Sequence, residues 1–493
     1  MAASLSDRAG FLIVANLIKY AVGFVMPMVL VRLLTQSDYG TYQQMILLGT
    51  AATGVLTLGL PTSIYYFYHH VGAKKVPALL VQTTLMLTAM GALAALTVAL
   101  WSKDFAALLN NPAMAGLLSL YALSLLFTIG SEHCLHVMIT QDRYTRAVVF
   151  EVAETFVRVL TLLAPLWWGF GFTGLIVGIV AYSALRFVVR NAYLLWRSGV
   201  PLQGWSRHTF VGEQLGYSIP VALGTLSALI ASTMNRGMLA ANFTPAHYAI
   251  YAVGALEIPL DVIFQASVAN VLRASLPQMV RDGDLAGVVR LMREAVRKLS
   301  IIVLPSFVFL LGHSYEFITL LFTSHYEDSV HVFRIYLWLV PLHMFILSPI
   351  PQVFGKPKIN LYIVVAMNAF LLMLGYVLLK TIGFYGPAVA MAITQYLQSA
   401  VFIAVAMRLT GASLFQMLPI PHMLRVLLAA AGALAASYQL AHWMAPGLAH
   451  LVLSGVLFSA VFFLLAVPLR IFSSADVGLM KRWALKFLPV KLA

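Results

Sequence analysis

The chain has 493 residues, of which 61% are hydrophobic and only 10% are charged. A soluble domain is about 45–50% apolar and about 25% charged, so the composition excludes an ordinary soluble protein and predicts an integral membrane protein. The formal net charge is +14, and the single cysteine, Cys134, excludes a disulfide framework and any multi-cysteine metal site.

Fourteen apolar stretches are long enough to cross about 30 Å of hydrocarbon as helices of roughly 20 residues. The first lies close to the N-terminus and lacks the pattern of a cleavable signal peptide. In chain order, spans 1 to 14 are predicted at 10–34, 43–67, 77–101, 114–139, 147–169, 171–195, 215–242, 248–272, 299–322, 332–355, 360–381, 384–407, 422–443 and 449–470. The sequence therefore predicts an all-α integral membrane protein.

The distribution of Lys and Arg predicts the orientation of the spans. If the N-terminus is inside, the outer ends hold only Arg32, Lys103, Arg334 and Lys380, and nearly all other basic residues lie inside. We therefore expect both termini to be cytoplasmic, and we interpret the positive charge as a topology signal rather than a nucleic-acid surface. The longest inner segment, 273–298, is basic and amphipathic, and we expect it to form a helix on the inner surface.

Two short motifs occur twice. TQSDYGTY at 35–42 and TPAHYAIY at 244–251 share one Thr and two Tyr at an offset of 209, and GFTG at 171–174 returns as GFYG at 383–386 at an offset of 212. Two matches in the same order favour a duplication of six spans. Because six is even, the halves would be parallel, as in transporters whose site lies between two lobes. We expect lobes at 1–208 and 209–410, with two additional spans and a cytoplasmic tail in 411–493.

An ordered set of motifs carries a family resemblance. Its members are Arg32-Leu33-Leu34-Thr35-x-x-Asp38-Tyr39-Gly40-x-Tyr42, Gly59-Leu60-Pro61-Thr62, Asn235-Arg236, Thr244-Pro245-x-x-Tyr248, Leu276-Pro277, Tyr326 to Arg334 and Gly355-Lys356-Pro357-Lys358. The set resembles the polysaccharide transporters, the bacterial lipid-linked oligosaccharide flippases of the multidrug/oligosaccharidyl-lipid/polysaccharide exporter superfamily. Asn235 departs from the family pattern, which is usually Asp-Arg.

The resemblance implies a function. It implies that an undecaprenyl-pyrophosphate-linked oligosaccharide is moved from the inner to the outer leaflet of the bacterial cytoplasmic (inner) membrane by alternating access, for exopolysaccharide or O-antigen assembly. It also implies that spans 1, 2, 7 and 8 surround the central cavity. Expected partners are the lipid-linked glycan, membrane lipids, and polysaccharide polymerase and export proteins, with no nucleic acid and no cofactor.

Ionisable side chains at membrane depth are candidates for the site, because each costs about 2.5–3.5 kcal/mol on insertion scales and needs a partner or a wet cavity. Lys19 shares one face of span 1 with Asn16, and Arg236 lies in span 7. Converging there, Lys19 and Arg236 can bind pyrophosphate or acidic sugars. The alternatives are a lysine that reaches the inner surface and an arginine in a structural ion pair.

Two carboxylates in span 8 are candidates for ion coupling. Glu257 and Asp261 are four residues apart, with Pro259 between them expected to kink the helix. Because two such carboxylates cannot both ionise cheaply in a low dielectric, we expect one to remain protonated and to couple transport to protons. Pairing with Arg236 or Lys19 is the alternative.

Other polar groups have mainly structural interpretations. Glu154 with Arg158 in span 5 is expected to be an ion pair, and Glu132 with His136 in span 4 a buried hydrogen-bonded pair, with a proton relay or sugar contact as its alternative. Tyr65 and Tyr66 end span 2 and either stack on sugars or belong to an interfacial aromatic belt.

Two rival functions remain open. No nucleophile–base constellation is evident and the outer loops are short, so we predict no enzyme and no catalytic or metal site. The alternatives to a polysaccharide-unit flippase are a lipid II flippase and a cation-coupled drug exporter of the same superfamily. A major-facilitator transporter is disfavoured, because the loop between spans 2 and 3 lacks its signature.

Overall fold

The computed structural model describes residues 5–141, 143–198, 210–441, 447–473, 476 and 478. Regular structure in these ranges is helical throughout, and they contain no strand. Helices suit a lipid environment because each backbone N–H and C=O is bonded within its own segment. The predicted all-α fold is confirmed.

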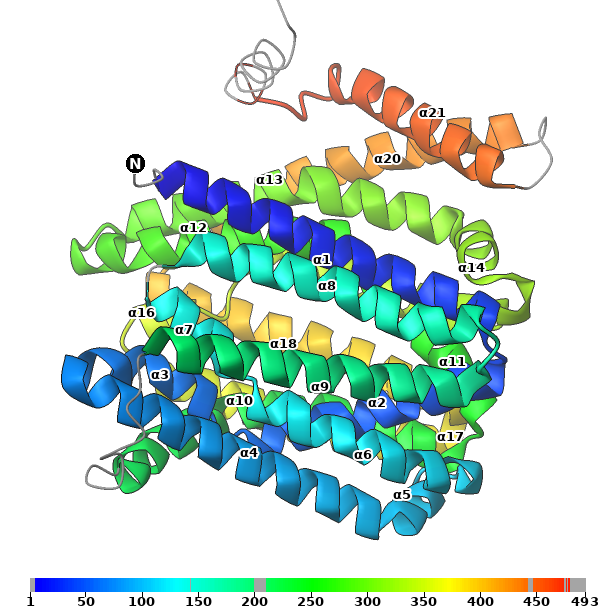
Figure 1. Cartoon of the computed structure of the whole chain (residues 1–493). Helices are drawn as coiled ribbons and strands as arrows, with labels where there is room; N and C mark the ends of the chain where they lie inside the picture. The colour runs from blue at the N-terminus through cyan, green and yellow to red at the C-terminus, as the bar shows by residue number, and fades with distance from the viewer. Residues whose placement is uncertain are drawn as a thin grey trace, which may run out of the picture. The chain divides into compact units, whose positions relative to one another are not determined.

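Figure 1 shows the helices. The α-helices are α1 (Leu5–Leu33), α2 (Gln36–Leu56), α3 (Leu60–His70), α4 (Val76–Leu100), α5 (Ser102–Leu108), α6 (Ala115–Gly130), α7 (Cys134–Thr140), α8 (Tyr144–Trp167), α9 (Gly171–Ser198), α10 (Val211–Asn242), α11 (Pro245–Gly254), α12 (Pro259–Arg281), α13 (Leu285–Gly312), α14 (Ser314–Phe322), α15 (Ser329–Leu337), α16 (Ile350–Val353), α17 (Pro357–Ile382), α18 (Gly386–Thr410), α19 (Leu414–Met417), α20 (Ile420–Ala441) and α21 (Leu448–Ala466).

Eight helical stretches of the described residues are long and apolar enough to cross a membrane. One of them, Pro357–Thr410, has 54 residues and contains both α17 and α18, which correspond to predicted spans 11 and 12. α1, α8 and α10 have 29, 24 and 32 residues and correspond to predicted spans 1, 5 and 7. The chain is a multi-pass membrane protein.

Several predicted spans are interrupted. Span 2 is divided into α2 and α3 at Leu58 and Gly59, whose φ angles of 49° and 69° are left-handed. Span 4 is divided into α6 and α7 by Ser131–His133, and span 8 into α11 and α12 by residues 255–258. Pro259 therefore begins a new helix instead of kinking a continuous one, because proline fits the first turn, where its missing N–H is not needed.

The C-terminal half also departs from the predicted pattern. Span 10 is not one helix, because α15, the 3-10 helix η5 (Val340–Met344) and α16 follow one another with breaks between them. The basic segment 273–298 is mostly helical, but its first part ends α12 and its part from Leu285 onward is continuous with span 9 in α13, so the separate surface helix is wrong.

Contacts divide the chain into two compact units. Unit 1 comprises residues 1–253 and 364–390, and unit 2 comprises 254–363 and 391–493. In unit 1, α4, α6, α9, α8 and α1 pack side by side in that order (Figure 1). In unit 2, α12, α13, α20 and α21 do the same. The repeat-based lobes 1–208 and 209–410 and the additional 411–493 segment stay a prediction, because contacts do not test a duplication.

The repeated turn has a structural role in unit 1. Thr35 caps α2 by accepting a hydrogen bond from the backbone N–H of Asp38 at 3.1 Å, and Thr244 occupies the equivalent place before α11. The two copies touch, because a Cβ on Gly40 would overlap the carbonyl oxygen of Pro245. Tyr39 and Tyr251 are almost completely buried beside this contact. Glycine is required here because only it permits so close a backbone approach.

Candidate functional site

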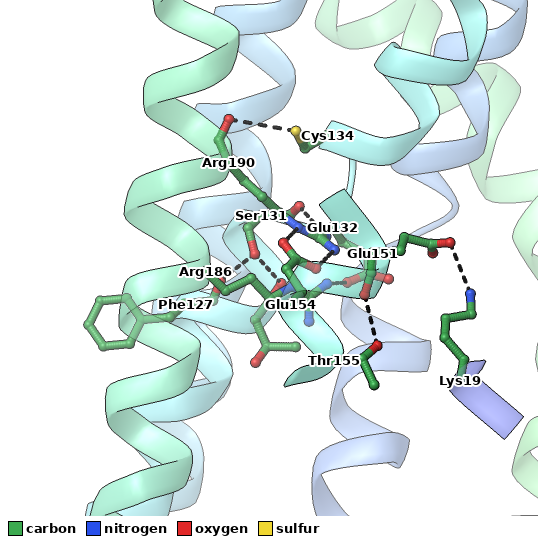
Figure 2. A network of polar contacts seen from close by, with 11 residues as sticks. Lys19, Phe127, Ser131, Glu132, Cys134, Glu151, Glu154, Thr155, Arg186 and Arg190 are labelled. Atoms are coloured by element: carbon green, nitrogen blue, oxygen red, sulfur yellow. Dashed lines mark hydrogen bonds and ion pairs between the residues drawn. The ribbon is translucent and has the colours of Figure 1, made fainter. Parts of the chain in front are cut away.

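The break in span 4 positions a cluster of charged side chains within unit 1 (Figure 2). Glu132 lies in the non-helical turn between α6 and α7, where the α-helical hydrogen-bond pattern is interrupted. Arg186 and Arg190 are one turn apart on α9, so both face the break. Glu151 and Glu154, also from neighbouring turns, project from α8.

Glu154 and Arg190 form the most buried pair of the cluster. The guanidinium donates from Nε and one Nη to the two carboxylate oxygens, at 2.7 Å each, while its other Nη donates to the backbone oxygen of Ser131 at 3.1 Å. The side chains are only 4% and 15% exposed. The predicted pair of Glu154 with Arg158 is therefore wrong, because the planar fork of Arg190 reaches Glu154 in a bidentate geometry.

Glu132 and Arg186 form a weaker, more open pair. One Nη of Arg186 donates to one oxygen of Glu132 at 2.8 Å, with exposed fractions of 15% and 35%. The buried Nε of Arg186 has no acceptor in the structure. Glu132 was expected to bind His136, but its carboxylate instead binds Arg186 across to α9.

Lys19 forms the third pair. Its ammonium group donates to Glu151 at 3.0 Å, and the side chains are 37% and 26% exposed. The bond joins α1 to α8, two helices that pack along their length. Lys19 therefore faces the interior of unit 1, although its cation is already paired.

Two adjoining cavities of about 370 and 480 Å³ surround this cluster. Glu132, Arg158 and Arg186 line both of them. The smaller one is lined by three carboxylates and four cations: Glu132, Glu151, Glu154, Lys19, Arg158, Arg186 and Arg190. The extra cation is Arg158, which is exposed to the cavities and has no ion pair among the described residues. The lining is therefore suited to an anion.

Arg236 lies in a separate small cavity of about 80 Å³, to which Gln43 and Tyr248 also contribute. Gln43 lines the Lys19 cavity too, so both predicted cations open onto neighbouring parts of unit 1. Arg236 is exposed and forms no ion pair within the described part of the chain. Its neighbour Asn235 is buried and donates to the backbone oxygen of Pro387 at 3.2 Å.

The remaining predicted ligands for the glycan are Asn16, Tyr65 and Tyr66, and neither tyrosine lines the two cavities. Asn16 is in α1, but its side chain lies outside the described residues. Tyr65 and Tyr66 are on α3, 44% and 41% exposed. The ring of Tyr66 stacks on His70 at 3.9 Å and on Tyr217 at 4.7 Å between centroids. Two rings so close cannot share one face, so Tyr66 is sandwiched and a sugar has better access to Tyr65.

The two predicted coupling carboxylates are in unit 2 and differ in their surroundings. Glu257 is exposed in the non-helical stretch before α12, whereas Asp261 lies in the first turn of α12 and is fully buried. Neither carboxylate oxygen of Asp261 has a hydrogen-bond partner in the structure. The pair does not share a helical face as expected, because the helix begins only at Pro259. The described residues contain no group of three His, Cys, Asp or Glu that could hold a metal ion.

Sequence analysis missed Arg186, Arg190 and Glu151. All three lie inside predicted spans, where a charge counts as a functional signal by default. Two arginines at i and i+4 in the middle of span 6 were the clearest available sign. Their partners were not predictable from spacing, because the pairs join residues 36 to 132 positions apart.

The comparisons with known proteins agree with this architecture. The fold is similar to that of the lipid II flippase MurJ in an inward closed conformation, with a TM-score of 0.71 and 11% identity over 94% of this chain and 98% of that one. It is also similar to an inward-facing multidrug resistance MATE family transporter of the MOP superfamily (TM-score 0.61, 14% identity, 83% and 96% covered). A MOP superfamily transporter from Pyrococcus furiosus is a third match (TM-score 0.57, 13% identity, 82% and 96% covered).

The fold is thus the one shared by these MOP superfamily flippase and transporter structures. A comparison with curated protein sequences finds no match. A family model described as "Polysaccharide biosynthesis protein" matches residues 29–331. The chain belongs to this polysaccharide biosynthesis family, and the resemblance seen in its motifs is confirmed.

Proposed function

We propose that the protein moves an undecaprenyl-pyrophosphate-linked oligosaccharide from the inner to the outer leaflet of the bacterial cytoplasmic membrane by alternating access, for exopolysaccharide or O-antigen assembly. Family membership supports the polysaccharide context. The charged cavities support the anionic headgroup, because pyrophosphate is the group that links lipid and sugar in such a substrate.

The proposal rests on two arginines whose hydrogen-bond donors are not all used. Arg158 has no ion pair among the described residues, and the buried Nε of Arg186 has no acceptor in the structure. Both line the two adjoining cavities. An arginine fork matches phosphate oxygens in a bidentate geometry, and it binds most strongly where water is partly excluded. The unused donors of these two cavity-lining arginines support binding of an anion that enters from the cavity.

The proposal is tested in proteoliposomes that contain a fluorescent lipid-pyrophosphate-oligosaccharide. Arg158→Gln should reduce the flipping rate at least about tenfold, since a hydrogen bond to a charged group contributes about 1.5–3 kcal/mol. Arg158→Lys should recover only part of it, because the fork is lost. Lys380→Gln is the matched control, since Lys380 packs on Tyr376 and lines neither cavity. Equal rates for Arg158→Gln and the control would contradict the proposal.

A substrate panel separates the alternatives in the same assay. Lipid II and a cationic drug take the place of the oligosaccharide lipid. Faster transport of lipid II would identify a lipid II flippase, and transport of the cationic drug alone would identify a drug exporter. The net positive charge of the cavity lining favours the oligosaccharide lipid and lipid II over a cationic drug.

We include Lys19 and Arg236 among the proposed headgroup ligands, and Asn16, Tyr65 and Tyr66 among those for the sugar. Lys19 and Arg236 line neighbouring cavities of unit 1. Export of glycan in cells should stop in the Lys19→Ala and Arg236→Ala variants at normal protein levels, and Arg236→Lys should restore less than full export. Normal glycan output from the double alanine variant would remove both residues from the site.

A further inference from the structure

We infer that Glu132 is a built-in counter-ion: its carboxylate occupies part of the anion site in the substrate-free protein, and an entering pyrophosphate displaces it from Arg186. The inference rests on the proposed function and adds a regulatory residue to that site. It follows from the contrast between two neighbouring ion pairs that involve arginines one turn apart on the same helix.

The Glu154–Arg190 pair is saturated. Its two parallel bonds of 2.7 Å and the third bond to Ser131 give each of the three nitrogens of the Arg190 guanidinium an acceptor, and the side chain is only 4% exposed. Removal of either partner would leave a buried charge without compensation, so this pair is costly to open. It fixes α8 to α9 and to the span-4 break, and we assign it a structural role.

The Glu132–Arg186 pair is not saturated. It has one bond of 2.8 Å, its carboxylate is 35% exposed, and the guanidinium keeps one buried donor without an acceptor. Glu132 also comes from the turn between α6 and α7, where i→i−3 bonds, such as that from the N–H of Glu132 to the oxygen of Ile129 at 3.2 Å, replace the α-helical pattern. Once released, the carboxylate can be solvated in the cavities it already lines. Opening this pair is therefore inexpensive.

Pyrophosphate has the charge and the shape to replace the carboxylate. It carries more negative charge than one carboxylate, and its adjacent oxygens can bind the free Nε and the released Nη of Arg186 together. Arg158 lines the same junction and has no ion pair among the described residues. Glu132 would thus keep Arg186 neutralised while the cavity is empty and compete with weaker anions for it.

The test measures binding of inorganic pyrophosphate by calorimetry to the full-length protein in nanodiscs. Glu132→Gln should bind about three- to tenfold more tightly than the wild type, because it removes a competitor worth up to about 1 kcal/mol and a repulsive charge. Glu213→Gln is the control for the loss of one negative charge: Glu213 is exposed and lines neither cavity, so this variant should not tighten binding. Glu132→Asp, which keeps the charge but is too short for the bond, should lie between wild type and Glu132→Gln.

Two further variants separate this inference from the proposed function. Arg186→Gln and Arg158→Gln should each weaken pyrophosphate binding. If they do, and Glu132→Gln binds no more tightly than wild type or Glu213→Gln tightens equally, the counter-ion role is wrong while the anion site stands. If both arginine variants bind like the wild type, the anion site and the proposed function fail together. Size-exclusion profiles and melting temperatures identify any variant that does not fold, in which case Glu132→Asp decides.

Discussion

The two arginines of α9 show how surroundings decide what a residue does. Arg190 is enclosed by Glu154 and Ser131, whereas Arg186 faces two cavities with a donor to spare. Both residues are arginines, and they lie one turn apart on the same helix. The difference comes from the partner: Glu154 belongs to a regular helix that holds it in place, and Glu132 to a break that does not.

The buried pair should be essential for stability. Glu154→Leu leaves Arg190 charged and enclosed, which costs about 3–5 kcal/mol, so the melting temperature in detergent should fall sharply. The double variant Glu154→Leu/Arg190→Met replaces the pair by apolar groups of similar size and should recover most of the loss. A double variant as unstable as the single one would show that the pair is not the cause.

Only some of the residues of this site were predicted from the sequence. It identified Lys19, Glu132, Glu154 and Arg158 as charges inside the membrane, and all four line one cavity. It paired them by helical spacing, which is local information, and the pairs with Glu132 and Glu154 were wrong because arginines from α9 are better placed. The choice between a neighbour on the same helix and one on another depends on packing, which spacing does not contain.

At the scale of the element, interrupted helices place functional groups at membrane depth. Residues 255–258 are non-helical and come directly before the buried Asp261 in the first turn of α12. Transporters of other folds bind coupling ions at such breaks, where carbonyl oxygens and a carboxylate converge. We therefore keep Asp261 as the proposed coupling residue, with Glu257, which is exposed, in a lesser role.

This assignment has a direct test. Asp261→Asn preserves the shape of the side chain but removes its proton exchange, so transport in proteoliposomes should no longer respond to an imposed pH gradient, while Glu257→Gln has a smaller effect. The difference in proton affinity between two conformations is what coupling requires. An unchanged response of Asp261→Asn would leave the carboxylate only a structural role, and a sodium dependence of the wild type would make it a cation ligand.

The N-terminal half of α13 binds the segment after α21. Arg297 donates two bonds to Glu294 and two to Asp476, whose carboxylate also accepts from the backbone and hydroxyl of Ser473. Burial raises the pKa of Asp476, but the hydrogen bonds from Arg297 and Ser473 outweigh it and bring the pKa to about 2, below its usual 3.8. Arg297 belongs to the basic segment that was expected on the membrane surface, and it instead binds another segment of the protein.

A depressed pKa means that this tether adds stability above the unfolded pKa and loses it as the pH falls towards about 2. The wild type should therefore melt at a higher temperature than Asp476→Asn, by an amount that is constant above about pH 5 and shrinks below about pH 4. Melting curves in detergent across this range provide the measurement. A difference that grows with acidity would contradict the assigned contact.

At the scale of the whole molecule, the main prediction concerns how the chain crosses the membrane. We propose that both termini are cytoplasmic and that the chain crosses the membrane fourteen times, on the basis of its Lys and Arg distribution. Cysteines introduced at Lys103 and Lys380 should react with an impermeant reagent in intact cells, and one at Lys74 only after permeabilisation. The background Cys134 is buried. A C-terminal reporter found outside would exclude an even number of crossings.

Composition and hydropathy sufficed to predict an all-α membrane protein, because lipid leaves helices as the simplest way to bond the backbone. Span positions were largely right where a helix is unbroken, as in α4, α9 and α17. The breaks at Leu58, Ser131–His133 and residues 255–258 were not predicted. Hydropathy does not detect these breaks, because an apolar stretch stays apolar whether its backbone is helical or unwound.

The order of the charged residues along the chain has a consequence for biogenesis. Glu132 and Glu154 are synthesised before Arg186 and Arg190, so spans 4 and 5 leave the ribosome with carboxylates whose α9 partners do not yet exist. Each uncompensated charge costs about 2.5–3.5 kcal/mol on insertion scales, and span 6 carries two arginines of its own. Spans 4 to 6 are therefore expected to enter the lipid together, and a chain that ends before Arg190 would be retained by the insertion machinery or degraded.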